Sequence, residues 1–431
     1  MNEARTIKVA LLGAGSVGSQ VARLLLEHAD DFEQRAGARI ELIGIAVRDP
    51  EAPRDVELPR ELLTTDVERL ILSADFVVEL MGGIEPARGL ITRALESGAD
   101  VVTANKALLA HHGPELFDLA ERVGAQLYYE AAVGGAIPII RPLRENLAGD
   151  RIDRILGIVN GTTNYILDRM HTLGDSLEES LRIATELGYA EADPTADIEG
   201  HDAQQKAAIL ASIAFHTHVP VERVHCEGIT GVTAAQIAEA ERSGHVVKLL
   251  AICERIGEAV SARVYPALVP AAHPLASVHG GNNAIFVEAA AAGPLMFYGA
   301  GAGGVQTASA VLGDLVSGAR RHVLGGPGTG ESMDADLPIV DFAEIRTSYQ
   351  ISLAVADEPG VLASIATTFA DHGVSVATFE QSPADDEGRA TLVIGTHEAA
   401  EGALRGLVEA LTAIPAVDRV AGVLRVEGVN R

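Results

Sequence analysis

Short apolar runs alternate with stretches of helical spacing over the first hundred residues of the chain. Residues 7–13 (IKVALLG) form a β-type run that ends in glycine, and residues 17–29 (VGSQVARLLLEHA) then place apolar side chains at helical spacing. Residues 86–97 show the same helical spacing. Three further β-type runs are found at 39–47, 74–80 and 99–103. Because strands alternate with helices, the pattern predicts a parallel, doubly wound α/β sheet.

The middle of the chain has a less regular pattern. Residues 154–161 (RILGIVNG) predict a strand that runs into a polar loop. An acidic loop at 188–200 separates two stretches of helical spacing, 176–187 and 201–215. Further elements are expected at 259–269 and 284–290 (strands) and at 305–318 (helix).

The last hundred residues begin with a stretch that is rich in Gly, Pro and Asp. This stretch, residues 325–338 (GGPGTGESMDADLP), is typical of a linker. The runs beyond it predict strand 349–356, helix 359–371, strand 374–380, strand 389–396, helix 398–412 and strand 417–427. This βαββαβ order is the ferredoxin-like arrangement.

The composition narrows the class of protein. The chain has 431 residues, of which 33 are Lys or Arg and 60 are Asp or Glu, for a formal net charge of −27. Such a chain lacks the clustered cations that bind nucleic acid or an anionic membrane, so we expect neither partner. No apolar run approaches the ~20 residues of a membrane span, and the N-terminus lacks the pattern of a signal peptide. Two cysteines, Cys226 and Cys253, fit a reducing compartment, so we expect a soluble cytoplasmic protein.

The first strand–helix junction carries a G-x-G-x-x-G motif. In this motif Gly13 allows a tight turn, Gly15 lets the backbone approach a pyrophosphate, and Gly18 permits close packing of helix and strand. Ser16 and Val17 begin the helix, whose unpaired N–H groups favour phosphate. An ordinary glycine turn is the alternative, but the position between strand and helix favours dinucleotide binding.

The choice of cofactor depends on the end of the second strand, where an acidic residue would bind the ribose of NAD. Arg48 stands there, and its guanidinium suits the 2′-phosphate of NADP, whereas Asp49 beside it keeps NAD as the alternative. A second glycine cluster, residues 299–304, precedes a predicted helix. This cluster is either a plain interdomain turn or a return to the nucleotide domain that places Gly303 against the cofactor.

Lysine is rare in this chain, so each lysine is informative. Only four of the 33 basic residues are lysines. Lysine can exchange a proton in catalysis and arginine cannot, so a retained lysine is a candidate acid or base. Lys206 follows the acidic loop, and Lys106 stands near Thr103 at the carboxyl end of a predicted parallel strand, where such sheets bind ligands. Lys8 and Lys248 have no such surroundings and are interpreted as surface charges.

The acidic loop and the helix after it bring together charges of both signs. Asp202 and Lys206 are four residues apart and share one face of the predicted helix, and Glu191, Asp193 and Asp197 precede them. Carboxylates beside one lysine suit a small polar substrate that carries an ammonium group and a carbonyl or hydroxyl. A solvated acidic loop with a routine surface ion pair is the structural alternative.

Residues 184–206 resemble the homoserine dehydrogenase signature at every fixed position, including Asp193-Pro194, Asp197, Gly200, Asp202 and Lys206. The similarity extends to residues 103–106 (TANK), 130–138 (EAAVGGAIP) and 160–165 (NGTTNY). The tail resembles an ACT domain, with the motif DEPGVL at 357–362. The resemblance implies an enzyme that interconverts L-aspartate 4-semialdehyde and L-homoserine with NAD(P)(H), in the biosynthesis of threonine, methionine and isoleucine.

The resemblance also implies roles for individual residues. Lys206 would protonate the aldehyde oxygen as hydride arrives, and Lys106 would assist near the nicotinamide. Glu191 and Asp202 would hold the substrate's amino group or orient Lys206, and Asp197 would line the pocket. The other implied substrate residues are Asn160, Gly161, Thr162 and Tyr189. The implied cofactor residues are Gly13, Gly15, Ser16, Val17, Gly18, Arg48, Thr103, Lys106 and Gly303.

A monovalent cation, usually sodium, is also bound by members of the family that this chain resembles. The matching positions are Glu130, Val133, Gly135 and Ile137, mostly through main-chain carbonyls. Oxygen ligands of this kind suit a hard cation. The alternative is a structural turn around Glu130.

The resemblance divides the chain into a Rossmann-type dinucleotide-binding domain, an α+β substrate-binding and dimerisation domain, and a regulatory domain. The expected boundaries are 1–135 (completed by about 300–325), 136–299, a linker at 326–347, and an ACT domain of βαββαβ order at 348–431. ACT domains pair side by side and bind amino acids, so we expect a homodimer or homotetramer that is sensitive to threonine. A pairing module without a ligand is the alternative for the tail.

Two other functions remain open at the level of sequence. The first is an NAD(P)-dependent amino-acid dehydrogenase that acts on a carbon–nitrogen bond. The second is a non-catalytic amino-acid sensor that has kept the nucleotide fold. The combination of Lys206, Asp202 and Glu191 favours an enzyme, since a sensor has no need of it.

Overall fold

The chain forms two compact units in a computed structural model that describes residues 6–325, 328, 330–382 and 389–428. The first unit comprises Met1–Gly161, Gln204–Val224 and Asn282–Leu337, and the second comprises Thr162–Ala203, His225–Gly281 and Pro338–Arg431. Parts of the predicted linker (326–327 and 329) and of the predicted ACT domain (383–388 and 429–431) lie outside the described residues.

The first unit contains a six-stranded sheet in the order β3-β2-β1-β4-β5-β6, with every neighbouring pair parallel. Its strands are β1 (Thr6–Leu12), β2 (Arg39–Ala46), β3 (Leu63–Thr64), β4 (Phe76–Glu79), β5 (Asp100–Thr103) and β6 (Leu127–Tyr128). This strand order is that of the Rossmann fold. The predicted doubly wound sheet is therefore confirmed.

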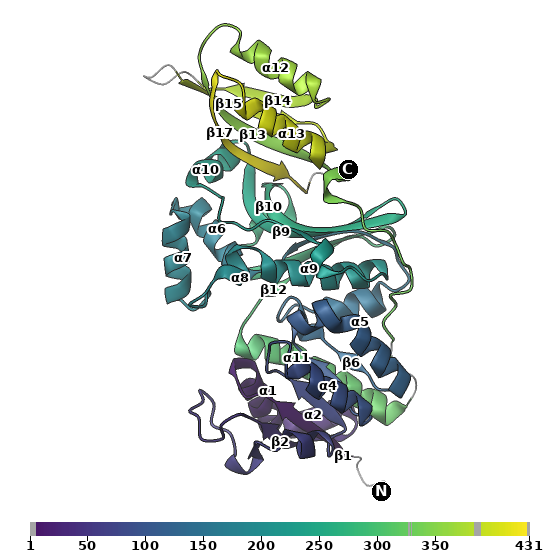
Figure 1. Cartoon of the computed structure of the whole chain (residues 1–431). Helices are drawn as coiled ribbons and strands as arrows, with labels where there is room; N and C mark the ends of the chain where they lie inside the picture. The colour runs from purple at the N-terminus through teal and green to yellow at the C-terminus, as the bar shows by residue number, and fades with distance from the viewer. Residues whose placement is uncertain (1–5, 326–327, 329, 383–388, 429–431) are drawn as a thin grey trace. The chain divides into compact units, whose positions relative to one another are not determined.

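Helices pack on this sheet to form its core. They are α1 (Ser16–Glu27), α2 (Ala29–Ala36), α3 (Val67–Ile71), α4 (Ala87–Glu96), α5 (Lys106–Val123) and α11 (Gly304–Leu324). Helix α11 comes from a distant part of the chain and lies beside α1 (Figure 1). Its residues Ala308, Val311 and Leu315 share one apolar core with Val9 and Val21. Burying these side chains stabilises the return of the chain to the nucleotide-binding sheet.

The first unit also contains an antiparallel group of three strands. These are β7 (Ile152–Ile158), β11 (Asn282–Ala289) and β12 (Gly293–Ala300), with β11 in the middle. Over residues 154–161 the sequence predicted a strand that runs into a polar loop, and this prediction was wrong for the last residue, where a helix begins. Strand β7 stops at Ile158, and helix α6 (Gly161–Leu173) starts at Gly161.

The second unit is built on the long hairpin of β9 (His245–Ile256) and β10 (Ala259–Pro270). Short strand β8 (His225–Cys226) pairs with β10. The helices of this unit before the tail are α6, α7 (Leu177–Glu186), α8 (Thr195–Ile198) and α10 (Ala234–Arg242). Helix α9 (His201–Phe215) contains the division between the two units.

The tail of the second unit has the predicted βαββαβ order. Its elements are β13 (Arg346–Ala356), α12 (Val361–Asp371), β14 (Val376–Gln381), β15 (Arg389–Thr396), β16 (Ala399–Ala400), α13 (Glu401–Thr412) and β17 (Val417–Val426). The sheet order is β17-β13-β15-β14, and α12 and α13 cover one face of it (Figure 1). Apolar side chains from the strands and both helices form a separate core. This arrangement is ferredoxin-like, as the sequence predicts.

Candidate active site

The glycine-rich loop after β1 has the geometry that a bound pyrophosphate requires. Gly13 has a φ of +100°, and a Cβ there would lie 2.8 Å from the Leu80 carbonyl oxygen. A Cβ on Gly18 would lie 2.2 Å from the Gly13 carbonyl oxygen, so helix and strand are in close contact. At Gly15, in contrast, a Cβ would meet no atom within 4 Å. The main chain is thus open at the position where a dinucleotide approaches it, and these residues fit the cofactor.

A second helix N-terminus lies beside this loop. Helix α11 begins at Gly304, and a Cβ there would lie 2.6 Å from the main-chain oxygen of Ser16 in the first turn of α1. The N-caps of the two helices, Gly15 and Gly303, make no side-chain capping bond. Two helix N-termini with uncapped N–H groups therefore meet next to the loop, an arrangement that favours an anion.

Arg48 lies two residues beyond the end of β2 and is exposed. Within the described part of the chain its side chain has no hydrogen-bond or ion-pair partner. The neighbouring carboxylate of Asp49 accepts a 2.9 Å bond from the Glu51 N–H and so helps to form the turn. Arg48 is the more available of the two side chains for a ligand.

Buried hydrogen bonds fix the position of Lys106. The carboxylate of Glu79, fully buried at the end of β4, accepts a 2.7 Å bond from the hydroxyl of Thr103 at the end of β5. That hydroxyl accepts a 3.0 Å bond from the Asn105 N–H, and the Asn105 side chain caps α5 through the Leu108 N–H. Lys106 is the first residue of α5 and is half-buried. Thus Lys106 stands at the carboxyl edge of the parallel sheet, where ligands bind in this fold.

Lys206 is almost entirely buried on α9, with 9% of the residue exposed. Its ammonium donates a 2.7 Å hydrogen bond to the carbonyl oxygen of Val159, just after β7. Asp202, 8% exposed, lies one turn earlier on the same helix. Because buried charged groups are rare and costly, the acidic-loop alternative with a routine surface ion pair is wrong for these two residues.

Further predicted substrate residues lie in the segment after β7. Asn160 is buried in the first unit and Gly161 begins α6. In the second unit, the hydroxyl of Thr162 donates a 2.6 Å bond to the main-chain oxygen of Tyr189. The Tyr189 ring stacks on Tyr165, with 4.5 Å between the ring centroids. These contacts hold the start of the acidic loop against the start of α6.

The carboxylates of the acidic loop differ in their exposure and in their hydrogen bonds. Asp193 accepts bonds from both the N–H and the hydroxyl of Thr195, and these bonds lower its pKa. Glu191 is exposed and, among the described residues, has no side-chain partner. Asp197 is half-buried on α8. Asp193 therefore shapes the loop, and Glu191 is the carboxylate that is available to a cationic group.

Glu130 organises the loop of the predicted cation site. Its carboxylate, 4% exposed, accepts main-chain bonds from Ile139, Ile140 and Arg141 at 2.6, 2.8 and 2.9 Å. The other predicted positions, Val133, Gly135 and Ile137, are buried in the same loop. Both carboxylate oxygens thus bind main-chain N–H groups, and the oxygens that fit a hard cation here are the main-chain carbonyls of the loop.

Lys248 is not a surface charge, so that interpretation of the sequence was wrong. It lies on β9 with 3% of the residue exposed, and its ammonium donates to Asn164 Oδ1 at 3.0 Å and to the Val278 carbonyl oxygen at 2.6 Å. Burial lowers its pKa to about 8, although the charge of Asp168 opposes this shift. A single lysine within the apolar run VVKLLAI was the available signal, because a strand that is apolar on both faces is buried on both.

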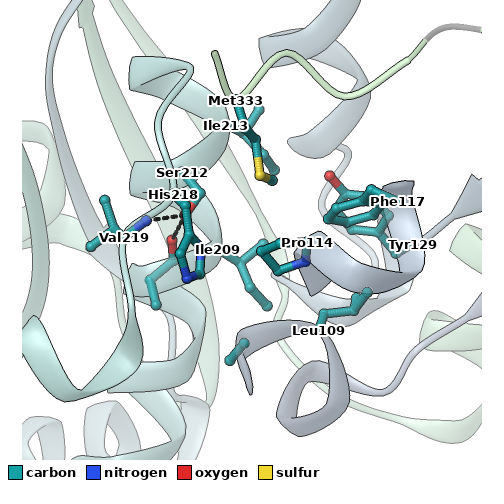
Figure 2. Close-up of a pocket in the computed structure, with 12 residues that line it drawn as sticks. Leu109, Pro114, Phe117, Tyr129, Ile209, Ser212, Ile213, His218, Val219 and Met333 are labelled. Atoms are coloured by element: carbon teal, nitrogen blue, oxygen red, sulfur yellow. Dashed lines mark hydrogen bonds between the residues drawn. The ribbon is translucent and has the colours of Figure 1, made fainter. Parts of the chain in front are cut away.

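The first unit also contains a small pocket. Side chains of α5 and α9 form most of its wall, together with Tyr129, His218, Val219 and Met333. Figure 2 shows Phe117 and Tyr129 on one side with Ile209 and Ile213 on the other. Its volume of about 20 Å³ holds little more than one water molecule. None of the predicted catalytic residues lines it. It is too small for the substrate.

The Rossmann sheet, the open glycine loop and the buried lysine define a nucleotide-dependent α/β oxidoreductase. Comparison with family models gives three matches. The chain matches "Homoserine dehydrogenase, NAD binding domain" over residues 13–130, "Homoserine dehydrogenase" over 138–316 and "ACT domain" over 349–416. The chain belongs to the homoserine dehydrogenase family.

Curated relatives and solved structures agree with this assignment. The chain is 53% identical to the homoserine dehydrogenase of Corynebacterium glutamicum, covering 98% of this chain and 96% of that protein. Identity to the Mycobacterium tuberculosis homoserine dehydrogenase is 52%, covering 99% of each. The crystal structure of the Thiobacillus denitrificans enzyme superposes with a TM-score of 0.91 at 38% identity, covering 99% of each chain. The protein is thus an NAD(P)-dependent oxidoreductase with homoserine dehydrogenase activity, which interconverts L-homoserine and L-aspartate 4-semialdehyde.

A more distant structural neighbour was solved with a nicotinamide cofactor bound. A hyperthermophilic archaeal homoserine dehydrogenase, solved in complex with NADPH, has a TM-score of 0.62 at 28% identity. The match covers 75% of this chain and 99% of that chain.

Among the described residues, no helix is long and apolar enough to cross a membrane.

Proposed function

We propose that Lys206 is the general acid and base of the reaction. A bound nicotinamide supplies or accepts the hydride. As the aldehyde is reduced, negative charge develops on its oxygen, and the Lys206 ammonium stabilises that charge and then donates a proton to it. The observation that carries this role is the buried ammonium, held at 2.7 Å from the Val159 carbonyl oxygen. In the oxidation of homoserine the neutral amine takes the hydroxyl proton.

Lys106 assists as a second cation near the reacting carbon. Its place at the N-terminus of α5 and the carboxyl edge of the sheet supports this role. Glu191 and Asp202 bind the substrate's ammonium group or orient Lys206, and Asp197 and Thr162 line the pocket. The exposed carboxylate of Glu191, which has no side-chain partner in the described part of the chain, supports its role. Asn160, Gly161 and Tyr189 complete the substrate-binding residues.

NADP is the proposed cofactor, with NAD as the alternative. Arg48 is exposed at the end of β2 and would bind the 2′-phosphate. Gly13, Gly15, Ser16, Val17 and Gly18 would hold the pyrophosphate, together with Gly303 at the start of α11. Thr103 and Lys106 would lie beside the nicotinamide. The NADPH complex of the archaeal relative supports this choice.

A monovalent cation, sodium by preference, is proposed for the loop of Val133, Gly135 and Ile137. Main-chain carbonyl oxygens of these residues would coordinate it. Glu130 would act through the loop, because its carboxylate holds the main-chain N–H groups of residues 139–141. The burial of Val133, Gly135 and Ile137 supports a site with little access to water.

The C-terminal domain is proposed to pair with a second copy and to make the enzyme sensitive to threonine. Its edge strand β14 is exposed at every residue, including Phe379. An exposed edge strand is available for pairing with another chain. A homodimer or homotetramer would result. The proposed boundaries are a nucleotide-binding domain at 1–135 completed by 300–325, a substrate and dimerisation domain at 136–299, a linker at 326–347 and an ACT domain at 348–431.

The test of this function is the reduction of NADP by the full chain with L-homoserine or L-aspartate as the substrate. We expect turnover with homoserine alone. Turnover with aspartate would instead indicate action on a carbon–nitrogen bond. Nucleotide binding without turnover of either amino acid would indicate a sensor.

A further inference from the structure

Arg425, on the last strand of the C-terminal domain, joins two acidic groups from different parts of the second unit. Its Nη1 and Nη2 atoms donate to the two carboxylate oxygens of Glu227 at 2.7 and 2.9 Å, and its Nε donates to Glu401 at 2.9 Å. The guanidinium also lies 4.4 Å from the ring centroid of Tyr265. The Arg425 side chain is only 11% exposed and that of Glu227 is 42% exposed, so their pair is partly buried, and its two-point geometry is of the kind that fixes a segment in place.

Glu227 is the partner outside the C-terminal domain. It directly follows β8, and its N–H donates a 2.8 Å bond to the Val264 carbonyl oxygen on β10. His225 Nε2 lies 2.7 Å from its Oε1 atom. Burial raises the pKa of Glu227, but the hydrogen bonds with His225 and Arg425 outweigh burial and bring it to about 2. The lowered pKa favours the ionised carboxylate, which is the form that pairs with Arg425.

The residues on either side of Glu227 contact the end of the acidic loop. A Cβ on Gly228 would lie 2.1 Å from the Ile198 carbonyl oxygen, and the Ile229 N–H donates to that oxygen at 2.7 Å. The Cys226 thiol donates to the Glu199 carbonyl oxygen at 3.4 Å. The backbones of 226–229 and 198–199 are thus in direct contact. No side chain larger than hydrogen fits at Gly228 without separating them.

The contacted segment lies between two of the proposed substrate residues. Asp197 precedes it on α8, and α9 begins just after it at His201. Asp202 is in the first turn of α9, and Lys206 is one turn further along. A shift of residues 198–200 would therefore move Asp197, which is proposed to line the pocket, and Asp202, which is proposed to bind the substrate's ammonium or orient Lys206.

We propose that Glu227 and Arg425 are positioning residues for the reaction. Their ion pair holds residues 226–229 against residues 198–200 and so sets the start of α9 for substrate binding. It also links the C-terminal domain to that site by contacts within one unit. The proposal rests on the proposed substrate roles of Asp197 and Asp202.

Glu227 is the side chain at which the link is best broken. Without it, Arg425 still pairs with Glu401, whose carboxylate is also held by Thr347 and Tyr349. The contacts inside the C-terminal domain therefore survive a change at Glu227. Glu227→Gln keeps the size of the side chain and removes its charge. Glu258→Gln is the matched control, because Glu258 is exposed in the turn between β9 and β10 and has no side-chain partner among the described residues.

The experiment is steady-state oxidation of L-homoserine by the full chain. We expect Glu227→Gln to raise the KM for homoserine roughly fivefold or more, since a hydrogen bond to a charged group is lost. The KM for NADP stays within about twofold, because neither Glu227 nor Arg425 belongs to the unit that carries the nucleotide loop. Arg425→Lys keeps the charge but loses the two-point contact, so it raises the same KM. The double variant is no worse than the poorer single variant, and Glu258→Gln matches the wild type.

Two results would overturn the proposal. One is a homoserine KM in Glu227→Gln that equals that of Glu258→Gln. The other is a pair of independent, fully additive effects from the Glu227 and Arg425 changes. If Glu227→Gln lowers the melting temperature, amide hydrogen exchange decides. Faster exchange confined to residues 198–206 supports the proposal, and exchange that is unchanged there rejects it. Loss of activity in Lys206→Met with normal kinetics in Glu227→Gln rejects this inference alone, whereas an active Lys206→Met rejects the catalytic assignment.

Discussion

The Nζ atom of Lys206 donates a hydrogen bond to the carbonyl oxygen of Val159 at 2.7 Å. This bond joins α9 to the end of β7, where the NGTTNY motif begins. A hydrogen bond from a charged donor contributes about 1.5–3 kcal/mol, enough to hold a flexible side chain in one direction. The ammonium is therefore preorganised before the substrate binds, as electrostatic stabilisation of a developing oxyanion requires.

Lys106 is expected to be less important than Lys206 but still necessary for a normal rate. Lys106→Met removes a positive charge from the carboxyl edge of the parallel sheet, so kcat for homoserine oxidation falls, by roughly 10- to 100-fold. The Asn105 cap and the Thr103–Glu79 bond remain, so the fold does not change. Steady-state kinetics with a melting curve of the variant provide the measurement. Wild-type kcat in the variant would remove Lys106 from the mechanism.

Arg48 is expected to set the preference between the two nicotinamide cofactors. In Arg48→Ala the 2′-phosphate loses a charged partner, so the ratio of kcat/KM for NADP to that for NAD falls about tenfold or more. Arg39→Ala is the control, since Arg39 is also exposed but stands at the opposite end of β2. An unchanged ratio in Arg48→Ala would show that Arg48 does not bind the 2′-phosphate and that another residue does.

Lys248 gives the second unit a pH dependence with a definite sign. Its folded-state pKa of about 8 lies below the ordinary value of 10.5, so between these values the folded state binds fewer protons than the unfolded state. The free energy of unfolding therefore rises with pH over that window, by at most about 3 kcal/mol from this group. Below pH 8 the cost of burying the charge is fully present.

Lys248→Met removes that contribution, so the difference between wild type and variant isolates it. Denaturant unfolding at pH 7.5 and pH 10.5 is the measurement. We expect the free energy of unfolding of the wild type, minus that of the variant, to increase as the pH rises. A constant difference between the two proteins across the window would mean that Lys248 is not buried as a charged group.

The C-terminal domain predicts a response to threonine, the end product of the pathway that the family serves. With the full chain, millimolar L-threonine is expected to lower the rate of homoserine oxidation. An unchanged rate would indicate that the domain is a pairing module without a ligand.

The proposed cation site predicts a dependence on sodium. Replacing sodium by tetramethylammonium in the same assay is expected to lower the rate, because a large cation does not fit the loop of Val133, Gly135 and Ile137. An unchanged rate would show that the reaction does not need a cation in this loop.

Local patterns in the sequence were sufficient for the elements whose signal is local. The strand, glycine turn and helix at Gly13 to Gly18, and the βαββαβ order of the tail, both follow from spacing and turn residues. The helix at Gly161 was missed because Gly, Thr and Asn are poor helix formers. Tertiary bonds such as that from Thr162 to the Tyr189 carbonyl oxygen favour the helix instead.

The buried charges could not be predicted in the same way. Lys248 meets Asn164, 84 residues away in sequence, and Arg425 meets Glu227, 198 residues away. From the sequence alone, a charged residue is assigned to the surface unless its partner is known, because burial without a partner is costly. The lysine count pointed to Lys206 as unusual, yet it could not distinguish the other buried lysine, Lys248, from the exposed Lys8.

The most direct test of the account compares Lys206→Met with Lys8→Met, a control that removes an exposed lysine from the same unit. NADP binding and homoserine oxidation are measured for both variants. We expect Lys206→Met to bind NADP normally and to lose about 10²- to 10⁴-fold in kcat, as the removal of a general acid predicts, and Lys8→Met to match the wild type. Homoserine oxidation by Lys206→Met at the wild-type rate would contradict the account.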